Sequence, residues 1–384
     1  MPVDRDRYEE FLALQTTLLG IGIAIILALI AALVGPHVVD WRSHRAMFER
    51  EASRLVGAQT HIDGAIDVKL LPVPSVTFRD VKIAGVTPEA GLSAREVSVE
   101  FALGSLVRGE WRATDMRLVA PEIHAGVDGK GHFAWAVNVS SADADTFSID
   151  QFSIQDGTVI LADAASKTRE KLERFSFSGD LRSLAGPVRG DGGFVIRGER
   201  YAYRLSLGRK DGDGATRLRL NLNPADRPIS SEIEGVLTLA KGVPAFAGTF
   251  TRTRTPDVKL AAGQVVANEP WRLTARVQAT PAQASFDQVE LLYGTEPRAL
   301  KFAGTGKFAF GVYPRLDATL TTRQADFDRL VSLPAGTRRL PLVVVGALVK
   351  PFDGAPPAFP VKVDLRAEAA TLGGGAIRNL RGTL

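Results

Sequence analysis

LLPVPSVTFRDVKI, residues 70–83, has the alternation of a β-strand but begins with two prolines. Proline has no N–H to donate to a neighbouring strand, so Pro72 and Pro74 predict an open edge or the start of a strand. Val76 and Phe78 share one face of this strand, and after residues 79–80 the apolar face is carried by Val81 and Ile83. A slip of one residue turns side chains to the other face unless a β-bulge absorbs it, so a bulge is predicted there.

The rest of the chain after residue 60 repeats this strand pattern. AREVSVEFAL (94–103), FSIDQFSI (147–154) and TVILAD (158–163) all alternate or nearly alternate apolar and polar residues. Several Asp-Gly pairs lie between such segments and predict hairpin turns between antiparallel strands. No linker rich in Pro, Gly or Ser divides residues 60–384, so we expect one continuous, mainly β body with few short helices.

Residues 11–39 contain no Asp, Glu, Lys or Arg and predict a transmembrane helix. A cleaved signal peptide is the alternative, but the apolar run is longer than usual and the leader before it is not net positive. Arginines lie on both sides of the span. The positive-inside rule taken alone would keep the body in the cytoplasm, although long domains cross membranes largely regardless of charge.

Residues 43–56 follow the span and predict a short amphipathic helix. Phe48, Leu55 and Val56 recur at helical spacing, and Gly57 is the predicted stop. Charges of both signs lie between the apolar residues. This mixture favours packing of the helix on the start of the sheet over adsorption to a lipid surface.

Composition excludes several kinds of chemistry. The chain has no cysteine, so disulfides, thiolate metal sites and cysteine nucleophiles are excluded. Its five histidines form no metal-binding motif, and neither a P-loop nor a G-x-S-x-G nucleophile elbow occurs. The 47 basic and 43 acidic residues are scattered, which gives no support for nucleic-acid binding. We therefore expect no enzyme, no metal, no cofactor and no nucleic-acid partner.

A series of short motifs resembles the N-terminal part of the AsmA family. In chain order the series is LxG, PxP, LxxLxxGxW, LxxPxI, DGxGxxxW and DGxVxLxD. The stretch 359–384 is similar to a recurrent segment of the same family. The six motifs lie at Leu55 with Gly57, Pro72 with Pro74, Leu103 to Trp111, Leu118 to Ile123, Asp128 to Trp135 and Asp156 to Asp163.

This resemblance implies an anchor in the inner membrane of a Gram-negative envelope. Residues 1–10 would lie in the cytoplasm, and residues 60–384 would form a periplasmic body of repeating β-groove units. Family members are linked to outer-membrane integrity and to bridge-like phospholipid transport, so phospholipids and the inner membrane are the expected partners, with outer-membrane or periplasmic proteins as further candidates. The chain ends on a predicted strand, so we expect the body to be incomplete at its C-terminus.

Two functions fit a long, curled antiparallel sheet with one apolar face. As an open groove, the face would shield acyl chains while headgroups stay in water. As the closed core of a membrane-tethered β scaffold, the same face would serve outer-membrane protein assembly without conducting lipid. The candidates to line a groove are Val97, Val99, Phe101, Leu103, Phe147, Ile149, Phe152, Ile154, Val159 and Leu161.

Overall fold

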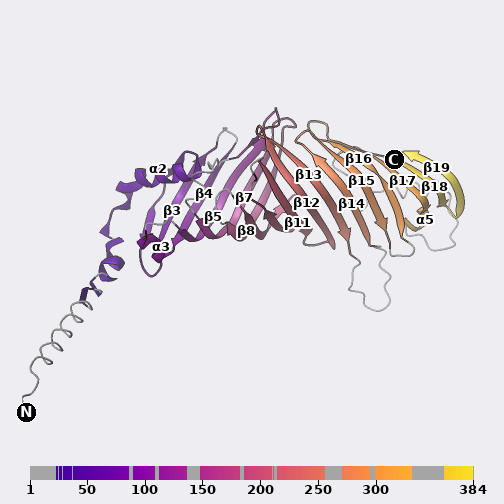
Figure 1. Cartoon of the computed structure of the whole chain (residues 1–384). Helices are drawn as coiled ribbons and strands as arrows, with labels where there is room; N and C mark the ends of the chain where they lie inside the picture. Colours follow the sequence, from indigo (N-terminus) through magenta and orange to yellow (C-terminus); the bar gives the residue numbers. More distant parts are fainter. Residues whose placement is uncertain are drawn as a thin grey trace, which may run out of the picture.

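The chain folds into one long, mainly β sheet, which confirms the predicted class (Figure 1). The described residues form 19 strands and few short helices. A computed structural model describes residues 23–24, 26–27, 29–36, 38–85, 90–108, 112–135, 148–181, 186–209, 211, 214–255, 270–294, 299–330 and 359–383.

Strands occupy most of the described chain. After residue 40, the helical elements of the described chain are the 3-10 helix η1 (Trp41–His44) and the α-helices α2 (Arg45–Val56), α3 (Leu103–Val107) and α5 (Phe327–Leu330). The strands are β1 (Thr60–Ile62), β2 (Ile66–Lys69), β3 (Ser75–Ala84), β4 (Gly91–Phe101), β5 (Arg112–Val127), β6 (Phe133–Ala134), β7 (Ser148–Asp163), β8 (Thr168–Leu181), β9 (Val188–Ile196), β10 (Glu199–Leu207), β11 (Ala215–Pro224), β12 (Ile229–Ala240), β13 (Val243–Arg254), β14 (Trp271–Ala279), β15 (Gln283–Tyr293), β16 (Leu300–Ala309), β17 (Arg315–Asp326), β18 (Val361–Leu372) and β19 (Gly375–Thr383).

Most strands pair with their neighbours in chain order. At the start, β1 and β2 both pair with β3, one at each of its ends, and the short β6 pairs with the end of β5. The arrangement is antiparallel except for two parallel pairs, β5 with β7 and β17 with β18. Parallel neighbours need a connection longer than a hairpin turn. Here the connections run through residues 128–147 and 327–360.

The change of phase predicted at residues 79–80 lies at Asp80, whose φ is 52°. The predicted bulge is absent, because β3 and β4 keep one register from Ser75 opposite Glu100 to Ala84 opposite Gly91. Ala120 of β5 and Asp156 of β7 have φ values of 47° and 53°, and the register places them level with Asp80 across the sheet. We call these three residues the slip line. Because neighbouring strands slip at the same level, their apolar residues change phase together and stay on one face.

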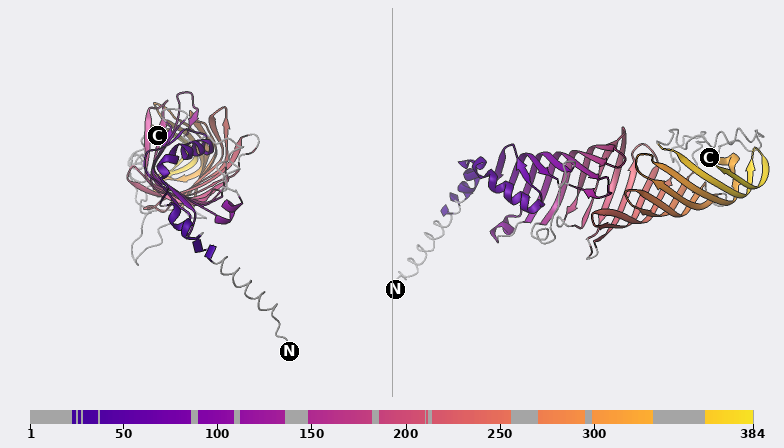
Figure 2. Two further views of the ribbon diagram at one scale, coloured as in Figure 1. Left: turned by 90° about the vertical axis from the view of Figure 1, so that its left-hand side faces the viewer. Right: turned by 90° about the horizontal axis from the view of Figure 1, so that it is seen from above.

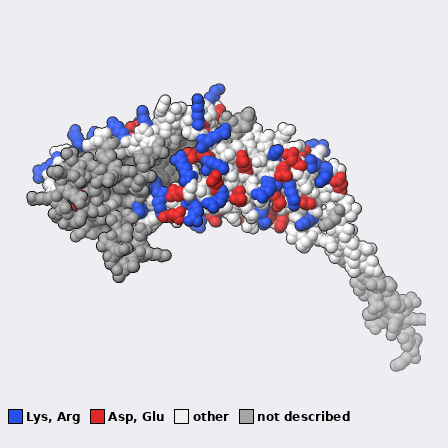
Figure 3. Space-filling view, turned by 180° about the vertical axis from the view of Figure 1, so that it is seen from behind, with Lys and Arg blue, Asp and Glu red and all other residues white. Residues whose placement is uncertain are grey.

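The apolar face is the inner face of a curled sheet. Figure 2 shows the strands curling around the long axis of the molecule, with α2 at the N-terminal end. The helix expected over 43–56 contains α2, whose Phe48 ring lies 5.5 Å from that of Phe78, edge to face. Leu55 packs against the same cluster, and Gly57 ends the helix with a φ of 70°. On the outside, charges of both signs are scattered over the described surface (Figure 3).

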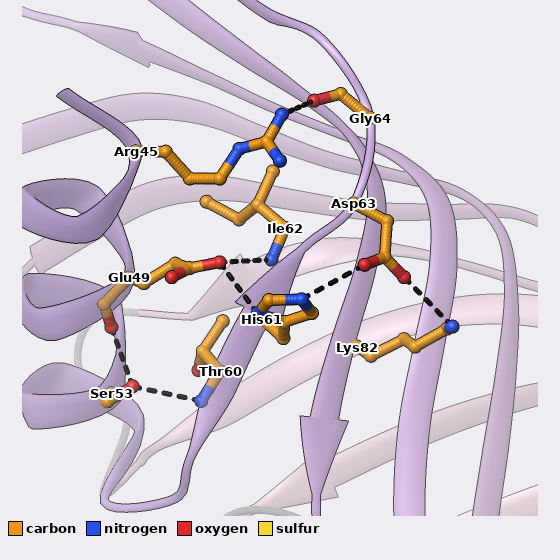
Figure 4. Close-up of polar contacts among 9 residues, drawn as sticks. All are labelled: Arg45, Glu49, Ser53, Thr60, His61, Ile62, Asp63, Gly64 and Lys82. Atoms are coloured by element: carbon orange, nitrogen blue, oxygen red, sulfur yellow. Dashed lines mark hydrogen bonds and ion pairs between the residues drawn. The ribbon is translucent and has the colours of Figure 1, made fainter. Parts of the chain in front are cut away.

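Hydrogen bonds hold α2 to the first strand (Figure 4). The Glu49 Oε1 atom accepts the backbone N–H of Ile62 at 2.9 Å and lies 2.8 Å from the Nδ1 atom of His61. The Ser53 Oγ atom accepts the N–H of Thr60 at 2.9 Å. These side chains satisfy N–H groups at the edge of the sheet, so the helix and β1 are joined directly.

Two packed clusters lie on the inner face, one toward each end. The first joins α2 to strands from β1 to β10 and includes the fully buried Ile62 and Ile149. The second joins strands from β15 to β19 and α5, with Phe302 and Phe327 buried. The strands between these clusters therefore differ from both ends.

The predicted transmembrane helix, residues 11–39, lies mostly outside the described part of the chain, as do all of residues 1–10. Several residues between 23 and 36 are described and helical. Among the residues that the structure describes, no helix combines the length and the apolar character needed to cross a membrane. The span therefore stays a prediction from the sequence.

Candidate functional site

Apolar side chains remain partly exposed on the inner face of β11–β14, between the two packed clusters. Among the described residues, six half-buried Leu, Ile and Phe side chains of these strands belong to neither cluster. The register places all six on the same face of adjacent strands. A half-open apolar surface on the concave side of a sheet is suited to an apolar ligand. We call this set the middle strip: Leu218, Ile233, Leu237, Phe246, Phe250 and Leu273.

Two glycines face each other within the middle strip, so no side chains rise from the sheet at that point. Gly235 of β12 pairs with Gly248 of β13, and the ring of Phe246 lies over both. A Cβ atom added at Gly248 would lie 2.7 Å from the Cζ atom of Phe246 and 2.2 Å from the carbonyl oxygen of Glu234. Any side chain at this position would displace the ring or the backbone. Glycine therefore lets the aromatic ring lie flat against the two strands.

One end of the middle strip is polar. Arg252 and Arg254 continue the inner face of β13 beyond Phe250, and the Nε atoms of both are buried. The Tyr201 hydroxyl donates to Glu199 at 2.6 Å, and the Arg227 Nε donates to it at 2.8 Å. These bonds, with that of Tyr201 first, hold the pKa of Glu199 below its ordinary value. We call Glu199, Tyr201, Arg227, Arg252 and Arg254 the polar end.

Eight of the ten residues predicted to line a groove share the inner face with the middle strip. Most of them form the first packed cluster or pack against it, so their side chains contact one another and α2 instead of solvent. Leu161, near the end of β7, differs because it is 43% exposed. The eight residues are Val97, Val99, Phe101, Ile149, Phe152, Ile154, Val159 and Leu161.

Leu103 does not occupy the predicted strand. The strand β4 ends at Phe101, and Leu103 begins α3 with its side chain 52% exposed. The register between β4 and β5 shifts after Glu100, so the chain leaves the sheet there. Alternation along a sequence continues past such a point and gives no sign of it. The tenth residue, Phe147, lies outside the described part of the chain.

The sequence did not single out the middle strip, although its strands alternate. TRLRLNL (216–222) and IEGVLTLA (233–240) have the same period as β4. The difference is tertiary, because α2 packs on the inner side of the first strands and no described element belongs to a packed cluster over β12 and β13. A local pattern carries no signal for the presence or absence of a covering element.

The hairpin of β5 and β6 connects the two opposite sides of the curled sheet on which the strands end. The strand pairings from β5 to β12 place the end of β5 on one of these sides and the β12–β13 turn on the other. Yet the N–H of Phe133 donates to the carbonyl of Gly242 at 2.9 Å, and a Cβ atom at Gly131 would contact Pro281. The twist of the sheet brings the two sides together at this point (Figure 1). We call residues 128–134 the bridging hairpin.

Asp128 organises the turn of the bridging hairpin. Its carboxylate accepts the Nδ1–H of His132 at 3.0 Å and the backbone N–H groups of His132 and Lys130 at 2.8 Å each. These bonds, with that of the His132 side chain first, lower the pKa of Asp128 from 3.8 to about 2. A carboxyl group whose pKa is lowered in the folded state stabilises that state at pH values above the ordinary pKa. This contribution is lost as the pH falls through the lowered pKa.

We therefore expect the bridging hairpin to loosen in acid. Because the chain has no cysteine, Lys130→Cys and Lys241→Cys can carry a pair of spin labels across the contact. The distribution of distances between the two labels should stay narrow above about pH 4 and broaden as the pH falls toward 2. Asp128→Asn should broaden it at neutral pH and remove the acid transition. Broadening that already begins near neutral pH in the unchanged turn would contradict this role of Asp128.

Other chemistry finds little support in the described residues. Within them, no group of three or more side chains could hold a metal ion. A hollow of about 710 Å³ near the last strands is lined largely by exposed polar residues, among them Lys301, Arg323, Arg366 and Glu368. Such a lining does not suit an apolar ligand, so the middle strip is the better candidate site.

Comparison with known proteins gives a family match at the N-terminal end of the chain. The model of the AsmA family matches residues 13–181, which end at the last residue of β8. This match confirms the resemblance found in the short motifs. It includes the ten predicted groove residues and the bridging hairpin, and it stops before the middle strip. No curated protein and no solved structure matches the chain.

Proposed function

Since the model of the AsmA family matches residues 13–181 of this chain, we propose that the protein supports phospholipid transport between the inner and outer membranes and so maintains the outer membrane. In this proposal a single N-terminal span holds the chain in the inner membrane of a Gram-negative cell, and the β body lies in the periplasm. The protein acts without catalysis, metal or cofactor. The observation that carries the proposal is the partly exposed middle strip.

The middle strip would hold acyl chains by removing apolar surface from water. Each methylene group transferred out of water contributes about 0.8 kcal/mol, so a few contacts suffice to hold a chain. The opposite face of the same strands is polar, as in the ion pair of Arg219 and Glu234 at 2.6 Å. Successive side chains of a strand point to opposite sides, so lipid would contact one face while water contacts the other.

The packed clusters decide where lipid would enter. The first cluster fills the inner face beneath α2 with buried side chains such as Ile62 and Val99. An acyl chain would therefore not reach the middle strip by following the inner face from the N-terminal helix. We place its entry at an edge of the sheet, beside β11–β14, where the inner face is not filled.

The same first cluster supports a second candidate function. A closed core built from α2 and the first strands is what a membrane-tethered scaffold for outer-membrane protein assembly would have. Such a scaffold would bind outer-membrane or periplasmic proteins and conduct no lipid. The two functions differ in what touches the middle strip in cells.

Photocrosslinking at neighbouring positions of β13 tests the proposed function. A photoreactive amino acid at Phe250, on the inner face, is expected to form adducts with phospholipid in cells. The same amino acid at Thr249, the adjacent and exposed residue of the opposite face, should form none. Mass spectrometry of the purified protein identifies the adducts. Adducts with protein alone at Phe250 would contradict transport and support the scaffold.

A further inference from the structure

Two arginines interrupt an otherwise apolar inner face. On β13, Phe246, Gly248 and Phe250 occupy inner positions, and the next two inner positions are Arg252 and Arg254. The exposed sides of the same strands have room for charged groups without loss of hydration. Two guanidinium groups on the inner side of one strand are therefore a feature that the packing of the sheet does not require.

Arg252 is buried at its Nε atom and lacks a partner there. Within the described part of the chain, that atom has no hydrogen-bond acceptor. Glu199, the carboxylate of the polar end, already accepts bonds from Tyr201 and Arg227. A buried cationic donor without a full set of acceptors costs free energy unless an anion completes it.

The charge of the polar end favours an anion. Arg227 is paired with the carboxylate of Glu199, and Arg252 adds a further positive charge beside this pair. A guanidinium group presents a planar pair of donors that matches two oxygens of a phosphate group. The middle strip begins on the same strand with Phe250, one inner position away from Arg252.

We propose that Arg252 binds the phosphate group of an amphiphile whose acyl chains lie on the middle strip. This inference rests on the proposed function and adds a headgroup site to it, with Arg252 as the residue that contacts phosphate. The polar end fixes which way the lipid lies, because the phosphate is held at the edge of the sheet and the chains extend across β11–β14. A lipid without phosphate would bind to the same strip with no fixed end.

Binding of two matched probes to the full-length chain in detergent tests this site. The probes are fluorescent phosphatidylglycerol and a fluorescent diacylglycerol with the same acyl chains and no phosphate. Arg252→Gln should weaken binding of phosphatidylglycerol by at least about tenfold, because it removes a charge-assisted hydrogen bond. Binding of diacylglycerol should not change. Arg252→Lys should bind phosphatidylglycerol with an affinity between those of the unchanged protein and Arg252→Gln, because it keeps the charge and loses the planar pair of donors.

Arg272→Gln is the matched control, because it removes an exposed arginine from the outer face of the adjacent strand β14. It should bind both probes as the unchanged protein does. If the Arg252→Gln protein keeps its affinity for phosphatidylglycerol, or if its affinity for diacylglycerol falls as well, the proposed phosphate site is contradicted and the proposed function stands. If the unchanged protein binds neither probe, the proposed function itself is wrong.

Competition distinguishes the sources of the anion. Millimolar inorganic phosphate should not displace phosphatidylglycerol, because it has no acyl chains to occupy the middle strip. Displacement by inorganic phosphate would indicate that Arg252 binds free phosphate ions and would overturn the proposal that it binds a lipid headgroup. Equal competition by a fatty acid would assign it to a carboxylate and overturn the preference for phosphate.

Discussion

Replacing Ile149 by Asp is expected to remove the folded protein from cells. Ile149 is 0% exposed in the first packed cluster, and its partners in the neighbouring strands are Ala113 and Leu181. A carboxylate there would be buried among apolar groups, at a cost of several kcal/mol. Because a folded domain is stable by only about 5–15 kcal/mol, this is a large share of the total. Immunoblots of membrane fractions measure the loss.

Gln151→Asp provides the control for this substitution. Residue 151 lies two positions further along β7 and is exposed. The same new charge at this position should leave protein abundance and the midpoint of thermal unfolding unchanged. Normal abundance of the Ile149→Asp protein would mean that the first cluster is not a packed core. The inner face would then be open from the first strands onward.

Replacing Ile233 by Asp is expected to leave the protein folded and to stop lipid passage. Ile233 belongs to the middle strip and is only partly buried, so a carboxylate at this position can stay hydrated when no lipid is bound. With lipid present, the charge would face acyl chains at a cost of about 3 kcal/mol, or a loss of more than about hundredfold. Arrival of newly labelled phospholipid in the outer membrane measures the effect at matched protein abundance.

Val236→Asp is the matched control for Ile233→Asp. Val236 is also β-branched, lies three residues away on the same strand and is 38% exposed on the outer face. Its substitution should change neither abundance nor lipid arrival. Equal lipid arrival in cells with the Ile233 and Val236 variants would contradict a role for the middle strip. Loss of the Ile233→Asp protein itself would place this residue in a packed core.

Local features of the sequence predicted the start of the sheet well. Pro74 immediately precedes β3, which begins at Ser75, and the predicted change of phase lies at Asp80, although the register there contains no bulge. Gly57 ends α2 as expected. Each of these features depends on the backbone geometry of one or two residues, which residue type alone restricts. The mainly β class followed from alternation repeated along the chain.

Tertiary relationships could not be predicted in the same way. Val99 and Ile233 both lie in alternating segments, yet one is buried in a packed cluster and the other is half exposed. The contact of Phe133 with Gly242 joins edges that are far apart in the order of strands. It arises from twist accumulated over several strands, which no single segment encodes. For the same reason the middle strip became visible only in the folded chain.

The slip line has a consequence for how this sheet can change during evolution. Loss of one residue at Asp80 would turn the apolar side chains of half of β3 outward while those of β4 stayed inward. Compensation would require matching losses in β4 opposite Asp80 and, further along the chain, at Ala120 and Asp156. Single-residue insertions and deletions should therefore be tolerated in the turns and rejected within these strands. Lineages of this protein would lengthen or shorten it by whole hairpins, in which each strand already has its change of phase at the level of the slip line.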